Sequence, residues 1–194
     1  MRKFSVRPAI TLRSRKFKGL RGFAGKPFHP PLTDIPIGAY VLGAGLDVGS
    51  VIGGHGHTWA REMWHAGTFV FVAGAIVSVF AALTGFFDWL RSSEPGTQAR
   101  RTANTHATIM LTVTALAIVD IALRLNSYHT EASTPVGIMI LSLVIAALVS
   151  LGATYGGSLV FDYGFNVETA GDSPVWHKSE TDVLPGEHGA SDSP

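Results

Sequence analysis

The stretch at residues 69–87, FVFVAGAIVSVFAALTGFF, contains no charged residue and no Asn, Gln or His. A helix on the surface of a soluble protein has a polar face, and this stretch has none. At 1.5 Å of rise per residue, a helix of about 20 residues crosses the roughly 30 Å of a hydrocarbon core. The sequence therefore predicts an all-α integral membrane protein, with spans expected at residues 35–54, 65–90, 104–125 and 136–161.

Composition leaves room for one folded domain. The chain is 46% hydrophobic and only 15% charged, so little remains outside the spans to form a second core. Short connections between the spans favour an antiparallel, up-down-up-down four-helix bundle. We expect three parts: a basic leader (1–27), the transmembrane domain (28–167) and an acidic tail (168–194). The tail lacks apolar periodicity, which is typical of disorder.

Charge asymmetry predicts the orientation of the bundle. Residues 1–26 hold nine of the 15 Lys and Arg and no acid, and three arginines follow the second span. Basic segments stay on the cytoplasmic side, and four spans return the C-terminus to that side. We therefore expect both termini in the cytoplasm, with the first span as an uncleaved insertion signal.

The basic leader predicts a partner as well as an orientation. Its cations alternate with apolar side chains such as Phe4, Leu12 and Phe17. That pattern suits a segment lying on anionic lipid headgroups, where each cation contributes about 1 kcal/mol. Organellar transit peptides and nucleic-acid-binding arms share parts of this composition. We interpret the leader as lipid-binding and expect no nucleic-acid partner.

Absent residues and motifs exclude several kinds of chemistry. The chain has no cysteine, so it offers no disulfide, thiolate metal site, iron–sulfur ligand or cysteine nucleophile. It also lacks a Gly-x-Ser-x-Gly elbow, a His-Glu-x-x-His pair and a phosphate-binding glycine loop. A redox centre bound by this chain would depend on histidine, and we expect no catalysis by the chain alone.

Ionisable side chains are costly at membrane depth and therefore mark candidate sites. A b-type haem between helices needs imidazole ligands, apolar walls and cations for its propionates. His29 and His106 are candidate axial ligands, although Pro30 and Pro31 predict that His29 lies outside the regular helix. A hydrogen-bonded cluster that ties helix ends together is the alternative. The layer near the cytoplasmic face holds His29, Asp88, Arg91, Arg100, Arg101 and His106.

The outer layer offers a second candidate site. His55, His57 and His65 form a ligand set that zinc or copper favours, although their spacing matches no strict metal motif. A solvated loop that contains histidines is the alternative.

Two carboxylates of the outer layer invite separate interpretations. Asp120 and Arg124 are i,i+4 neighbours, so we expect them to neutralise each other. Asp47 is a candidate proton or cation ligand for transport, which in so small a chain would require a homo-oligomer. Glycines at positions 45, 49 and 53 predict a contact face on the same span.

Four segments resemble a bacterial membrane family catalogued as domain of unknown function 2231. The similarity covers roughly residues 28–167. It implies a four-helix protein of the bacterial cytoplasmic (inner) membrane, and relatives joined to Rieske-type domains imply electron-transfer company. Because a Rieske domain needs cysteines, such a partner would be a separate iron–sulfur protein. The segments are HPPLTDIPIG (29–38), LTGFFD (83–88), RRTANTH (100–106) and GGSLVF (156–161).

Together these patterns favour a redox-associated membrane subunit with a b-type haem or a quinone at its inner face. A membrane scaffold or accessory subunit is the second interpretation, and a small ion or metal transporter is the third.

Overall fold

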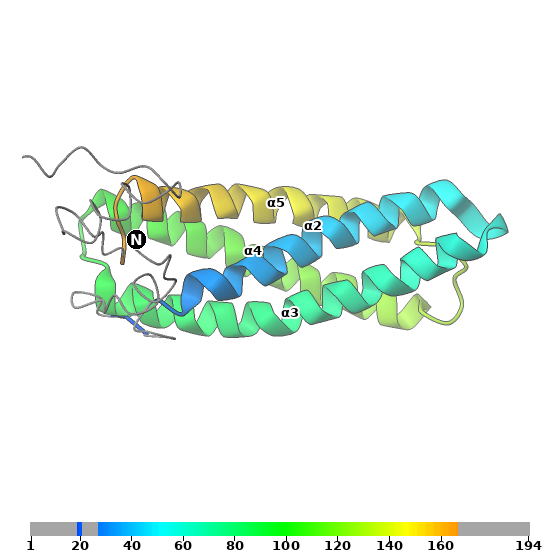
Figure 1. Cartoon of the computed structure of the whole chain (residues 1–194), viewed down its shortest axis with the longest axis horizontal. Helices are drawn as coiled ribbons and strands as arrows, with labels where there is room; N and C mark the ends of the chain where they lie inside the picture. Colours follow the sequence, from blue (N-terminus) through cyan, green and yellow to red (C-terminus); the bar gives the residue numbers. More distant parts are fainter. Residues whose placement is uncertain (1–18, 21–26, 167–194) are drawn as a thin grey trace, which may run out of the picture.

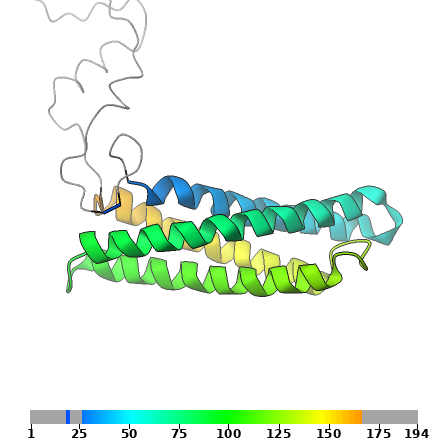
Figure 2. The same ribbon diagram turned by 90° about the horizontal axis from the view of Figure 1, so that it is seen from below.

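The structure is a computed structural model that describes residues 19–20 and 27–166. Four long helices make up most of this part of the chain, and each is long and apolar enough to cross a membrane. They run antiparallel to their neighbours in sequence and pack side by side (Figure 1 and Figure 2). The predicted all-α membrane bundle is thereby confirmed. The helices are α2 (His29–Gly53), α3 (Thr58–Ser92), α4 (Gln98–Ser127) and α5 (Val136–Phe161), with a 3₁₀ turn η2 (Gly54–Gly56) after α2.

Three of the helices begin earlier than the apolar spans indicate. The prediction that His29 lies outside the helix is wrong, because α2 begins at that residue. Pro30 and Pro31 occupy its first turn, where a backbone N–H has no helical partner and its loss costs little. The basic leader and acidic tail fall almost entirely outside the described residues, so their predicted roles stay predictions.

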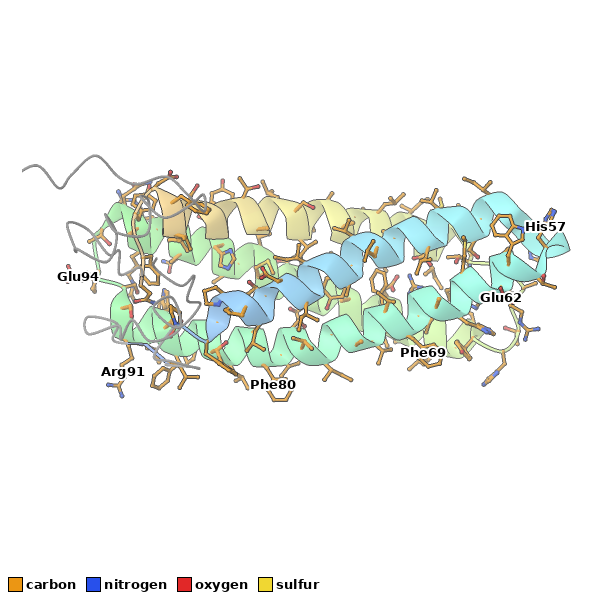
Figure 3. The ribbon with its side chains drawn as sticks, viewed as in Figure 1. His57, Glu62, Phe69, Phe80, Arg91 and Glu94 are labelled. Carbon is orange, nitrogen blue, oxygen red and sulfur yellow. The ribbon has the colours of Figure 1, made fainter. Side chains whose placement is uncertain are left out.

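Buried positions recur at intervals of three and four residues over long stretches of the helices. On α5 they include Ile138, Ser142, Ile145 and Val149. This period is that of helices packed by knobs into holes with a left-handed twist. The opposite faces carry large exposed apolar side chains, among them Phe69 and Phe80, which Figure 3 shows pointing away from the bundle. Those faces suit contact with lipid.

The centre of the bundle is apolar. Tyr40, Phe71, Val113, Ile145 and Val149 are at most 1% exposed and pack together. Each helix has two neighbours, so α2 contacts α3 and α5 while α4 lies diagonally across from it.

Two polar layers flank this centre. The histidine end, which includes His29 and His106, lies where α3 connects to α4. The arginine end, which includes Asp47, Asp120 and Arg124, lies towards η2.

Glycines allow the close approach of α2 and α3. A Cβ added to Gly43 would lie 2.5 Å from the ring of Phe71, and one added to Gly53 would lie 2.6 Å from Trp59. Gly49 similarly faces Met63. Gly45 has nothing within 4 Å, so the predicted contact face includes Gly49 and Gly53 but not Gly45.

Candidate functional site

His29 connects α2 to α3. Its Nδ1 lies 2.9 Å from the backbone carbonyl of Ala81 and 3.4 Å from Oγ1 of Thr84. Because a carbonyl only accepts, Nδ1 carries the proton and donates, and the lone pair of the ring is on Nε2. The ring lies against Gly85, where an added Cβ would be 2.6 Å from Cε1.

His106 repeats this arrangement between α4 and α5. Its Nδ1 lies 2.8 Å from the carbonyl of Gly152, so this ring also presents Nε2 as the unprotonated nitrogen. Gly156 lies beside the ring, and a Cβ there would be 3.1 Å from Cε1. Each imidazole is therefore oriented by a carbonyl one helix away and flanked by a glycine.

The two imidazoles meet across the bundle. Their ring centroids are 6.4 Å apart and their planes cross at 82°. They come from the diagonal helices α2 and α4, so the pair spans the bundle at the histidine end. Among the described residues, no hydrogen-bond partner is found for either Nε2.

Asp88 lies one turn beyond Thr84 on α3 and is only 4% exposed. Its Oδ1 accepts a hydrogen bond of 2.8 Å from the backbone N–H of Leu20. The carboxylate therefore holds a residue of the leader against the bundle. Among the described residues it makes no hydrogen bond to either histidine.

The three arginines of the inner layer are held at the connection between α3 and α4. Arg100 donates to the backbone and hydroxyl oxygens of Ser93 and stacks on Trp89, 4.1 Å from its centroid. Arg101 bonds Gln98 and Gly96, and Arg91 lies exposed over Phe87. In the described part of the chain, the alternative cluster of His29, Asp88, Arg101 and His106 has no mutual hydrogen bonds.

The arginine end contains a buried ion network. Arg124 donates through Nη1 to Oδ1 of Asp47 at 3.0 Å and through Nη2 to Oδ2 of the same residue. Its Nε bonds Oδ2 of Asp120, and all three side chains are 0% exposed. The expected Asp120–Arg124 pairing is present. The contact with Asp47 was not expected, because it joins residues 77 apart in sequence.

Hydroxyl groups extend the hydrogen bonding around Asp47. Thr134 donates to its Oδ1 at 3.1 Å, and the Thr134 amide donates to Ser50 at 2.8 Å. Ser50 in turn donates to the carbonyl of Ala60 at 2.7 Å. Gly67 leaves room for the pair, since a Cβ there would lie 3.3 Å from Asp47. Sequence reasoning missed Ser50, Thr134 and Gly67 because small residues carry no distinctive pattern.

The three outer histidines do not converge. His55 and His57 lie exposed at the tip of the bundle, where His57 bonds the carbonyl of Gly53 (Figure 3). His65 belongs to α3 rather than to a loop and stacks on Tyr128 at 4.3 Å. Within the described ranges, no three His, Asp or Glu side chains could hold a metal together. The geometry lends the predicted metal site no support.

Residues 25–169 match a family model described as "Predicted membrane protein (DUF2231)". The chain belongs to this family. The matched region of this DUF2231 member includes both polar ends of the bundle. No curated protein and no solved structure matches the chain.

Proposed function

We propose that this DUF2231 protein is a redox-associated membrane subunit that holds a b-type haem between His29 and His106. The matched hydrogen bonding of the two imidazoles carries the proposal. Histidines that bind metals usually donate their other ring N–H to a carbonyl or carboxylate, which fixes the tautomer and orients the ring. Both rings have that bond, to Ala81 and Gly152.

The spacing of the rings supports one ion between them. A metal–imidazole bond is about 2 Å long and a ring centroid lies about 1 Å beyond its nitrogen, so opposite ligands have centroids roughly 6 Å apart. The centroids of His29 and His106 are 6.4 Å apart. Ligands on diagonal helices also leave the other two helices free to flank a planar group.

The flanking helices are built from small side chains at this level. Thr84 and Gly85 on α3, and Gly152 and Gly156 on α5, lie beside the imidazoles. Larger residues at Gly85 and Gly156 would displace the two imidazoles from these positions. A haem bound here would supply one-electron transfer, and the two Nδ1–H bonds would tune its potential by strengthening the ligands.

The protein also has a proposed orientation in the membrane and a proposed partner. The histidine end faces the cytoplasm of a bacterial inner membrane, in accord with the basic leader that precedes α2. Electrons pass to or from a separate electron-transfer protein, for which an iron–sulfur protein is the first candidate. The connection between α3 and α4 at this end holds Arg91, Arg100 and Arg101. Their long side chains are the candidates to reach the propionates of the haem.

Titration with haemin tests the proposal directly. The purified full-length protein in mild detergent is titrated, and its absorption spectrum is recorded before and after reduction with dithionite. We expect one haem per chain with a Soret band that shifts on reduction. His29→Ala and His106→Ala each abolish the six-coordinate spectrum, and added imidazole restores it. His55→Ala and His57→Ala are matched controls that leave the spectrum unchanged.

Either of two results would contradict the haem assignment. In the first, the folded wild type takes up no haemin and the purified protein is colourless, which favours the scaffold interpretation. In the second, His55→Ala or His57→Ala removes the spectrum as fully as His106→Ala does, which places the site elsewhere.

A further inference from the structure

The ion network at the arginine end joins two carboxyl groups to one arginine. Asp47 and Asp120 are two carboxyl groups, and Arg124 is the one cation among the described residues that contacts them. An arginine side chain stays protonated in proteins, so the network cannot balance itself by losing a proton. With both carboxylates ionised, a net charge of −1 would be buried among side chains of 0% exposure, which is strongly unfavourable in a protein interior.

The two carboxylates are bound very differently. Both oxygens of Asp47 accept hydrogen bonds, two from Arg124 and one from Thr134. Asp120 accepts one, through Oδ2 from Nε of Arg124. Its Oδ1 is buried and has no partner among the described residues. The surrounding protein therefore stabilises Asp47 as a carboxylate and leaves one oxygen of Asp120 unused.

Within residues 27–166, the side chains around the network offer no second cation. The α3 residues Trp64 and Phe71 stack on Arg124, with Cζ 5.2 Å and 4.3 Å from the ring centroids. The hydroxyl of Tyr40 on α2 donates to Ser78 at 3.4 Å. His65 on α3 is engaged with Tyr128, and its Nε2 lies 3.2 Å from that residue's carbonyl.

A second buried polar atom in this layer also lacks a partner in the part of the chain that the structure describes. It is Nε1 of Trp64, the residue whose ring lies over Arg124. Unpaired buried polar groups are rare in folded proteins, and two in one layer point to something small that completes it. A proton fits Oδ1 of Asp120, and a water molecule that accepts a hydrogen bond fits Nε1 of Trp64. A larger ligand would need a cavity.

We propose that Asp120 is an intramembrane proton-binding site, with the proton on Oδ1. The proton neutralises the excess charge, and the network then consists of one ion pair, Asp47 with Arg124, and one neutral carboxylic acid. It comes from the aqueous phase at the η2 end of the bundle. This site is independent of the haem proposal, because it lies on the opposite side of the apolar centre.

Two asparagine variants test the proposal as a matched pair. Asn has the shape of a neutral carboxylic acid, so Asp120→Asn should keep the melting temperature of the wild type within about 2 °C, whereas Asp47→Asn should lower it by roughly 6 °C or more. Infrared difference spectra at neutral pH provide a second readout that does not depend on stability. The wild type should show the carbonyl band of a protonated carboxylic acid, shifted in D₂O, and Asp120→Asn alone should lose it.

Three results would overturn the proposal. The first is that Asp120→Asn unfolds the protein or destabilises it as much as Asp47→Asn does. The second is that the spectra of the wild type and Asp120→Asn show the same carbonyl bands. The third is that the band disappears when choline is replaced by sodium at constant pH, which would assign the site to a metal cation.

Discussion

The two polar ends of the bundle use side chains of α2 and α4 in different ways. At the arginine end, charged groups from α2 and α4 contact each other directly. At the histidine end, groups from the same two helices keep their ring centroids 6.4 Å apart and bond carbonyls of the other helices instead. At the first end the charged groups bond one another, whereas at the second the two Nε2 atoms have no hydrogen-bond partner among the described residues.

This difference separates a network that stabilises the bundle from a pair of side chains that is suited to holding a cofactor. A buried network in which charges bond each other stabilises one packing of the helices, since removing one member leaves the others unpaired. A pair of histidines that are each oriented by a carbonyl and do not bond each other adds little to stability and is better explained by a group that the pair holds. Mutations at the arginine end should therefore be tested by unfolding, and mutations at the histidine end by haemin binding.

The largest effect is expected from Arg124→Met. This change leaves the carboxylate of Asp47 buried without its cation and Oδ2 of Asp120 without its donor, which should destabilise the protein by about 3–5 kcal/mol. Unfolding of the detergent-solubilised protein by heat or denaturant measures it. Arg91→Met is the matched control, since Arg91 is exposed and in no ion pair among the described residues.

A triple variant sharpens this prediction. Replacing Asp47 and Asp120 with Leu together with Arg124→Met removes the whole network and should recover most of the lost stability. If Arg124→Met alone is tolerated, the arginine end does not stabilise the bundle and the contrast with the histidine end fails.

Gly85→Ala should affect the histidine end without removing a ligand. The added methyl group would lie 2.6 Å from Cε1 of His29, so the ring must move. We expect weaker haemin binding and a destabilisation of about 1–3 kcal/mol from overpacking. Gly45→Ala is the control, because nothing lies within 4 Å of that position. Equal spectra for the two variants would show that the position of His29 is unimportant.

The sequence predicted the four helices because uninterrupted apolar stretches require a membrane and dictate helices within it. It also predicted the Asp120–Arg124 pair, since four residues on one helix fix the geometry. The contact of Arg124 with Asp47 depends on the rotation of two helices about their axes. That rotation is set by packing of Gly43, Gly67 and their neighbours, and no local pattern reports it.

The same limit applied at the histidine end. Sequence reasoning selected His29 and His106 by depth in the membrane, and the structure brings them together. Sequence reasoning did not identify the carbonyls of Ala81 and Gly152, because residue types do not indicate which carbonyl faces a neighbouring helix. Sequence reasoning also placed His29 outside the regular helix, whereas α2 begins at that residue.

Ser50→Ala should weaken the arginine end modestly. The hydroxyl accepts from the amide of Thr134 and donates to the carbonyl of Ala60, so its loss leaves a buried N–H unpaired. We expect about 1–2 kcal/mol of destabilisation, measured by the same unfolding assay. Ser150→Ala serves for comparison, because Ser150 is exposed and bonds only its own helix. If both serine variants behave alike, the link from α2 to Thr134 is not part of the network.

The smallest effect is expected from Asp88→Ala. Asp88 holds the N–H of Leu20, and the carbonyl of Leu20 accepts from Phe28 at 3.1 Å, so both sides of this backbone unit are paired. Removing the carboxylate should cost about 1 kcal/mol and speed hydrogen exchange at the Leu20 amide, while the Soret band of the haemin complex stays unchanged. Asp88→Asn keeps an acceptor oxygen and should exchange like the wild type. A change in the haem spectrum of Asp88→Ala would instead make this carboxylate part of the histidine site. The contrast between the two ends would then have to include a charged group at the histidine end.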